Sequence, residues 1–61
     1  MPLINVNLYE GRLTPETAPR LIEGMTNVLV EVFGEGMREH TTVILEETKP
    51  QHWGVAGKPS A

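Results

Sequence analysis

Hydrophobic and polar residues alternate near the start of the chain, across residues 3–9. Ile4, Val6 and Leu8 fall on one face of an extended segment, and the residues between them fall on the other. This period of two, with branched side chains, predicts a β-strand that places one face on a core. Residues 41–46 are also rich in β-branched side chains and predict a second strand, apolar on both faces near its middle.

Between these two segments the apolar residues recur at offsets of one, three and four positions, the repeat of an amphipathic α-helix. Thr14 followed by Pro15 is a typical helix start, a capping hydroxyl before a proline at the first helical position. Pro19 lies one turn further on, so either the helix begins there or its first turn is irregular. Gly34 is expected to end the helix. The apolar stripe consists of Leu21, Ile22, Met25, Val28, Leu29, Val32 and Phe33, and the polar face of Arg20, Glu23, Thr26, Asn27 and Glu31.

A strand, a long helix and a second strand make one β-α-β unit, for which we expect parallel strands and a right-handed crossover. The tail after residue 46 is rich in turn-forming residues around Trp53, and it predicts a small hairpin or an arm that docks on a neighbouring subunit. The expected fold class is therefore α/β, as a single domain over residues 1–61. One helix on a two-stranded sheet cannot close a core by itself.

The size of the chain strengthens this last point. A domain of 61 residues buries only about 60% of its unfolded surface, and small scaffolds usually need disulfides, a metal or self-association. The chain has no cysteine and no Cys/His cluster for zinc. We therefore expect an obligate homo-oligomer.

Charge and hydropathy exclude some partners. The formal net charge is −3, and an acidic, aromatic-poor surface is a poor partner for nucleic acid. No run approaches the ~18 apolar residues of a membrane span, and no charged segment precedes an apolar one as in a secretory signal. We expect no nucleic-acid or membrane partner, and a cytoplasmic location.

Pro2 is the first residue with candidate chemistry. Aminopeptidases remove an initiator methionine when the next residue is small, which would give Pro2 a free secondary amine. Burial or a cation lowers the pKa of an amine from about 7.7–8.0, so a desolvated Pro2 close to Arg12 is expected to be a neutral general base near pH 7. The alternative is that Pro2 merely begins a strand, where a missing N–H does no harm. Arg12 is suited to hold a substrate carboxylate by a bidentate pair, or is an ordinary surface arginine.

Five other residues carry side chains suited to a site. Trp53 is suited to form the apolar wall that keeps an amine unprotonated, or to pack in an interface. His40 and His52 are twelve residues apart, which is no metal-ligand spacing, so we expect no metal site. Glu46 and Glu47 are adjacent in a strand and point to opposite faces, so we expect solvated side chains rather than an acid–base pair.

Together these segments resemble the 4-oxalocrotonate tautomerase family over nearly the whole chain. The likeness rests on Pro2, on the strand that ends Leu8-Tyr9-Glu10-Gly11-Arg12, on Leu21-Ile22-Glu23, on Glu46-Glu47 and on His52-Trp53-Gly54-Val55-Ala56-Gly57. It implies β-α-β protomers that pair into four-stranded sheets, three such dimers forming a hexamer, and active sites between subunits. It also implies, without any cofactor, ketonisation of an unsaturated 2-hydroxy acid such as 2-hydroxymuconate. In that scheme the Pro2 amine is general base and acid, Arg12 binds the far carboxylate, and Trp53 occupies the aromatic-wall position.

Thr42 departs from the family's pattern. The best-known members carry a second arginine there, which holds the carboxylate beside the reacting oxygen. A threonine hydroxyl offers one neutral hydrogen bond instead, and charge-assisted bonds are about twice as strong. Arg38, four residues earlier, is an alternative cation if the link before the second strand folds back. Val55 stands where chloroacrylate-hydrating relatives use a glutamate, which disfavours a dehalogenase.

Two alternatives from other classes stay open on the sequence. A subunit that kept the fold but lost efficient substrate binding with the second arginine would be catalytically weak or silent. A reactive N-terminal amine would also support promiscuous condensation with carbonyl compounds.

Overall fold

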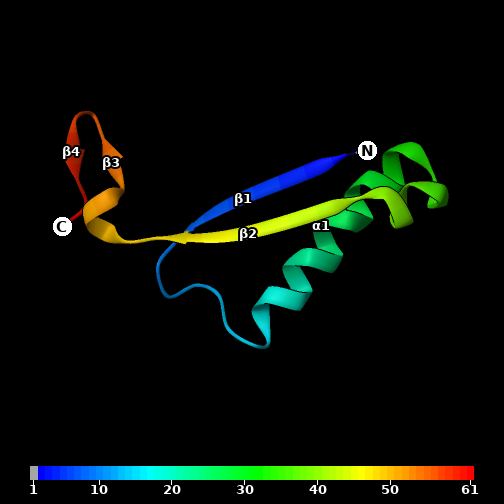
Figure 1. Ribbon diagram of the computed structural model, residues 1–61, viewed down its shortest axis with the longest axis horizontal. Helices are drawn as coiled ribbons and strands as arrows, with labels where there is room; N and C mark the ends of the chain where they lie inside the picture. The colour runs from blue at the N-terminus through cyan, green and yellow to red at the C-terminus, as the bar shows by residue number, and fades with distance from the viewer. Residues whose placement is uncertain (1) are drawn as a thin grey trace.

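The computed structural model describes residues 2–61 and forms one β-α-β unit followed by a short hairpin (Figure 1). The strands β1 and β2 pair in parallel, and β3 and β4 pair antiparallel. The α/β class, the parallel strands and the C-terminal hairpin are confirmed, whereas the expected loss of Met1 lies outside the described residues. In chain order the elements are β1 (Leu3–Tyr9), α1 (Thr17–Phe33), the 3₁₀ helix η1 (Glu35–His40), β2 (Thr42–Thr48), the 3₁₀ helix η2 (Pro50–His52), β3 (Gly54–Val55) and β4 (Lys58–Pro59).

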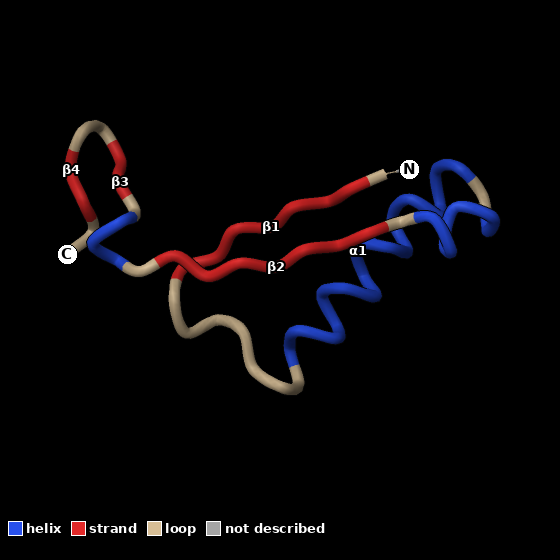
Figure 2. Tube along the Cα trace, in the orientation of Figure 1, coloured by secondary structure: helices blue, strands red, loops and turns tan. Residues whose placement is uncertain are grey.

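The β1–β2 sheet has one face on the helix and one open face. Ile4, Val6 and Leu8 of β1 are half-buried and alternate with exposed residues, as the sequence predicts. Val43 and Leu45 repeat the pattern in β2, and the register places them beside Ile4 and Val6. Figure 2 shows α1 running obliquely along this pair, against which it packs. The other face of the sheet has no covering element among the described residues.

Helix α1 begins at Thr17, two residues after the proline that was expected at its first position. The hydroxyl of Thr14 still caps this end, because it accepts hydrogen bonds from the N–H groups of Thr17 at 3.0 Å and Glu16 at 3.2 Å. Pro19 lies within the first turn of the helix, a region that tolerates proline. The start of α1 is thus fixed by the loop before it.

The far end of α1 stops at Gly34, as expected. This glycine has a φ of 104° and donates its N–H to the Val30 carbonyl. The chain then forms η1, where the sequence predicts only a link, and β2 runs on to Thr48, two residues beyond the expected end. None of the described helices has the length and hydropathy that crossing a bilayer requires.

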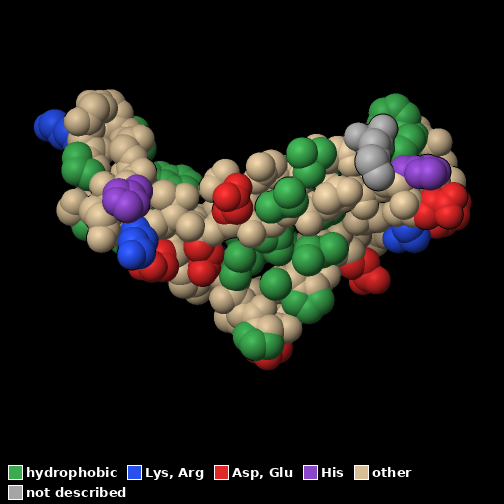
Figure 3. Space-filling view, in the orientation of Figure 1, with side chains coloured by type: hydrophobic (Ala, Val, Ile, Leu, Met, Phe, Trp, Pro, Cys, Tyr) green, Lys and Arg blue, Asp and Glu red, His purple; other side chains and the backbone are tan. Residues whose placement is uncertain are grey.

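No described residue is fully buried in one protomer. Leu21, Met25 and Leu29 of the expected stripe are half-buried, but its other members are exposed. The radius of gyration is 14.2 Å, against about 10.5 Å for a compact chain of this length. Hydrophobic side chains reach the surface over the middle of the molecule and at its N-terminal end (Figure 3). This surface indicates self-association. The exposed large apolar residues are Leu3, Ile22, Val28, Val32, Phe33, Ile44 and Val55, at 42% to 67% exposure.

Candidate functional site

The residues singled out from the sequence lie at two opposite ends of the β1–β2 pair. Pro2 and Thr42 are neighbours, since the Thr42 N–H donates to the Pro2 carbonyl oxygen at 3.0 Å. Arg12 follows the other end of β1. The seven residues of β1, at about 3.3 Å each, separate the two ends by roughly 20 Å. The expectation that Pro2 lies close to Arg12 is therefore wrong within one protomer.

At the Pro2 end, Arg38 is already engaged. Its guanidinium pairs with the Glu35 carboxylate and donates to the Asn27 side-chain oxygen at 2.9 Å. The hydrogen bond between Arg38 and Glu35 lowers the pKa of the Glu35 carboxyl and raises that of Arg38. These two partners hold the Arg38 guanidinium through Nε and Nη1, whereas Thr42 is exposed on the open face of the sheet.

At the other end, the carboxylate of Glu47 holds the loop that carries Arg12. One oxygen, Oε2, accepts hydrogen bonds from the N–H groups of Gly11 at 2.8 Å and Leu13 at 2.9 Å. The bond from Leu13, followed by those from Gly11 and Arg12, lowers the pKa of the Glu47 carboxyl, although desolvation opposes them. Gly11 has a φ of 96°, a conformation that suits glycine and lets successive N–H groups converge on an anion. Glu47 is exposed, but the expectation of a merely solvated side chain is wrong.

The backbone carbonyl of Arg12 is also held by a hydrogen bond. The Thr17 hydroxyl, on the first turn of α1, donates to the Arg12 carbonyl oxygen at 3.0 Å. The side chain of Arg12, unlike its backbone, is not held by an ion pair. The ion pairs within residues 2–61 are Arg38–Glu35 and His40–Glu39. A fixed backbone with an exposed, unpaired guanidinium is suited to bind an anion.

A hollow of about 420 Å³ lies beside this loop, lined by Arg12, Thr17, Arg20 and Leu21. Two guanidinium groups line it and no carboxylate does, in a chain whose net charge is −3. Sequence reasoning placed Arg20 on the polar face of the helix and did not connect it with Arg12. The available signal was its place in the first turn of the helix, next to the loop that carries Arg12.

Trp53 lies at the Arg12 end of the sheet. Its ring meets that of Tyr9, the last residue of β1, edge to face, with centroids 5.7 Å apart. The Ser60 N–H donates to the Trp53 carbonyl at 2.8 Å and to the Pro50 carbonyl at 3.2 Å, which closes the hairpin on η2. The half-buried indole thus packs beside Tyr9, and it is far from Pro2 of the same protomer.

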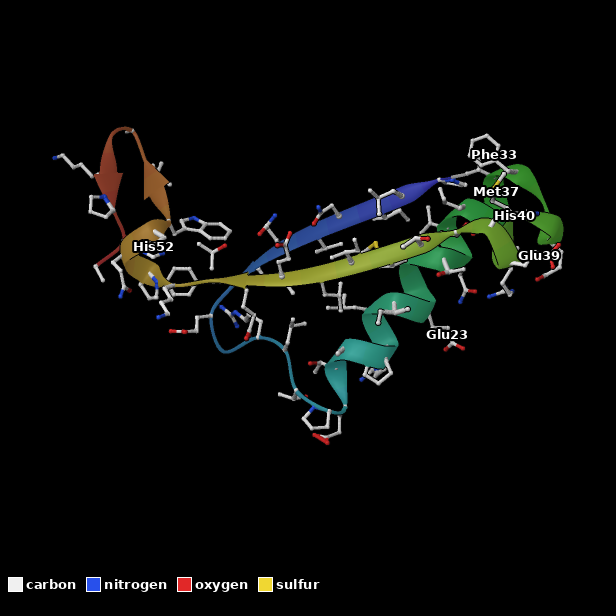
Figure 4. The ribbon with its side chains drawn as sticks, in the orientation of Figure 1. Glu23, Phe33, Met37, Glu39, His40 and His52 are labelled. Carbon is white, nitrogen blue, oxygen red and sulfur yellow. The ribbon has the colours of Figure 1, made fainter. Side chains whose placement is uncertain are left out.

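The two histidines are far apart. His40 lies near Met37 and Phe33 at one end of the molecule, and His52 lies at the hairpin end (Figure 4). Across residues 2–61 no three His, Cys, Asp or Glu side chains are grouped to hold a metal ion.

The structure thus defines a small α/β protein, an open β-α-β protomer with a proline before its first strand and an exposed arginine after it. The family model described as "Tautomerase enzyme" matches residues 2–61. The chain belongs to this tautomerase family, and it is an isomerase of the keto–enol type.

Known proteins show the same likeness. A protein of Ralstonia nicotianae named "Probable tautomerase" is 46% identical over 61 residues, which cover 100% of this chain and 84% of that protein. The crystal structure of TomN, a 4-oxalocrotonate tautomerase homologue of the tomaymycin biosynthetic pathway, superposes with a TM-score of 0.85 at 41% identity, covering 97% of this chain and 88% of TomN. A heterohexameric 4-oxalocrotonate tautomerase from Chloroflexus aurantiacus gives a TM-score of 0.83 at 25% identity, covering 98% of this chain and 94% of its own. The resemblance to 4-oxalocrotonate tautomerases is confirmed.

Proposed function

We propose that this protein converts an unsaturated 2-hydroxy acid, such as 2-hydroxymuconate, to its 2-oxo isomer, in a homo-oligomer and without a cofactor. The Pro2 amine, freed by removal of Met1, would act as general base and then as general acid. Arg12 would bind the carboxylate far from the reacting hydroxyl. The family supports the reaction class, and the chemistry of the residues supports these roles.

The observation that carries the proposal is the separation of the candidate residues into two halves. Pro2 and Thr42 lie at one end of the β1–β2 pair, and Arg12 and Trp53 lie at the other. A small substrate cannot touch both ends of one protomer. The open sheet face and exposed helix residues leave room for a second copy that brings its Arg12 end to the Pro2 end of the first. A hexamer, as the family resemblance implies, would contain several such junctions.

The proposed reaction moves one proton and leaves the atoms of the substrate unchanged in number. The Pro2 nitrogen takes the proton of the 2-hydroxyl group, the electrons of the dienol shift along the conjugated chain, and the same nitrogen returns a proton to a distant carbon. Negative charge moves toward the far carboxylate during this shift. Arg12 would stabilise that charge, and fixed charges of this kind are commonly the largest catalytic contribution.

The neighbours of the amine would tune its pKa. Trp53 of a neighbouring copy would exclude water from it, which lowers the pKa of an amine. Thr42 would offer its hydroxyl to the carboxylate beside the reacting oxygen. Because this group is neutral, we expect weaker binding of that carboxylate than an arginine would give.

The test is ultraviolet-monitored ketonisation of 2-hydroxymuconate by protein whose intact mass confirms the loss of Met1. Pro2→Ala should lower kcat/KM by about 100-fold or more, the range expected for loss of a general base. The variant must keep the oligomeric mass of the wild type, so that a loss of assembly is not read as a loss of chemistry.

Two results would contradict the proposal. Turnover no faster than buffer would favour a different substrate or a silent subunit, the alternative that the uncharged Thr42 suggests. Turnover unchanged by Pro2→Ala would remove the proline from the mechanism. Reductive trapping with a small aldehyde, followed by peptide mass analysis, tests separately whether the amine condenses with carbonyl compounds.

A further inference from the structure

Glu47 occupies a position where the sheet pattern calls for an apolar side chain. In the parallel register it pairs with Leu8, and it follows Val43 and Leu45 at intervals of two on the face toward α1. Its neighbour Glu46 points to the open face. Because this side chain is exposed, water could solvate it, so the backbone donors that it binds instead point to a role in the loop that carries them.

Those donors are the backbone of the loop around Arg12. Gly11 and Leu13, which flank this arginine, both donate to Oε2 of Glu47. The preceding residue, Glu10, donates its N–H to the Thr48 carbonyl at 3.0 Å and so extends the strand pairing into the loop. With the Thr17 hydroxyl on the Arg12 carbonyl, the backbone is held on both sides, and Glu47 supplies the side-chain bonds that reach this loop from β2.

We propose that Glu47 is a positioning residue for Arg12. By fixing the loop to the end of β2, it would place the guanidinium where the substrate's far carboxylate binds, without touching the substrate. The inference rests on the proposed function of Arg12. Its physical basis is that a long, exposed side chain reaches a defined point only if its backbone is fixed, and a displacement of about 1 Å at a binding group can cost 100-fold in rate.

The chain offers a matched pair of variants. Glu47→Gln removes the charge and keeps the shape, and Glu46→Gln makes the same change one residue away on the opposite face. With 2-hydroxymuconate we expect Glu47→Gln to lower kcat/KM by about tenfold and Glu46→Gln to change it less than twofold, because charge-assisted bonds are about twice as strong as neutral ones. Oligomeric mass and thermal unfolding would establish that both variants are assembled.

A second substrate separates positioning from general damage. 2-Hydroxy-2,4-pentadienoate has the reacting dienol but lacks the far carboxylate, so Arg12 has nothing to bind. Glu47→Gln should leave its kcat/KM within twofold of the wild type. An equal loss on both substrates would overturn the inference, since a merely structural residue would affect both.

The double variant completes the test. If Glu47 acts through Arg12, Glu47→Gln should cause no further loss in an Arg12→Ala background, whereas independent effects would multiply. If Arg12→Ala lowers kcat/KM for 2-hydroxymuconate but Glu47→Gln does not, the inference about Glu47 is overturned and the proposed function stands. An Arg12→Ala without effect on the diacid would instead contradict the proposed function, and the inference with it. Should Glu47→Gln fail to assemble, Glu47→Asp, which keeps the charge but is shorter by one methylene, carries the same comparison.

Discussion

Arg20 belongs to the candidate site because of its position next to Arg12. It lies on the first turn of α1, is exposed, and lines the same hollow as Arg12. An exposed cation of this kind contributes little energy and is screened by salt. Its contribution should therefore be to the attraction of an anionic substrate rather than to the chemical step.

Replacing this arginine tests that view. Arg20→Ala should raise KM for 2-hydroxymuconate by about two- to fivefold, the range of an exposed ion pair, with kcat nearly unchanged because substrate and transition state lose the same interaction. Lys58→Ala in the hairpin removes the same charge and is the control. A fall in kcat equal to the rise in KM, or an effect that persists undiminished in high salt, would contradict this assignment.

Residue roles were the least predictable part of the site. Pro2 and Arg12 are recognisable in the sequence by their chemistry. Their separation, however, follows from the extended length of β1, which lies between them. Glu47 contacts Gly11 across 36 positions of sequence, and this contact depends on the register of two strands. No local pattern encodes such a register, so the carboxylate was assigned to solvent.

Elements with a regular repeat were well predicted, because alternation and helical periodicity are local properties. The helix stop at Gly34 and both long strands are where the pattern places them, within one or two residues. The two 3₁₀ helices were missed, since segments of three to six residues carry no measurable period. The start of α1 was misplaced because Thr14 caps it from three residues upstream, through bonds to Glu16 and Thr17.

The hydrogen bonds that Thr14 accepts at the start of α1 should contribute to stability. Thr14→Ala should lower the free energy of unfolding by about 1 kcal/mol, the usual value of an N-terminal cap. The comparison is Thr26→Ala, whose hydroxyl bonds the Ile22 carbonyl within the same helix and should cost less, because alanine is the better helix former. Denaturant unfolding at one fixed protein concentration measures both, and a smaller loss for Thr14→Ala than for Thr26→Ala would contradict the cap.

The whole protomer is an incomplete unit. It is elongated, with extents of 42 × 26 × 15 Å, and its helix and sheet leave apolar side chains uncovered. The short chain and its lack of cysteine already predict this from the sequence. Assembly would therefore complete the core and join the two halves of the proposed site in one event.

Mixed oligomers test the shared site directly. Pro2→Ala and Arg12→Ala should each be nearly inactive alone, but unfolding and refolding them together should restore activity. With random mixing of equal amounts, roughly one quarter of the sites would combine an intact proline with an intact arginine from another copy. Each variant refolded alone is the control. A mixture no more active than its components would contradict a site built between copies.

The bond between Thr42 and Pro2 leaves the nitrogen of Pro2 out of the strand pairing. Strand β1 is tied to β2 at this end through the carbonyl oxygen of Pro2, and a proline nitrogen has no hydrogen to contribute to a sheet. The pairing of the strands thus makes no demand on the nitrogen that the proposed reaction would use. Strand pairing and the proposed proton transfer thus draw on different atoms of one residue, the carbonyl oxygen and the nitrogen.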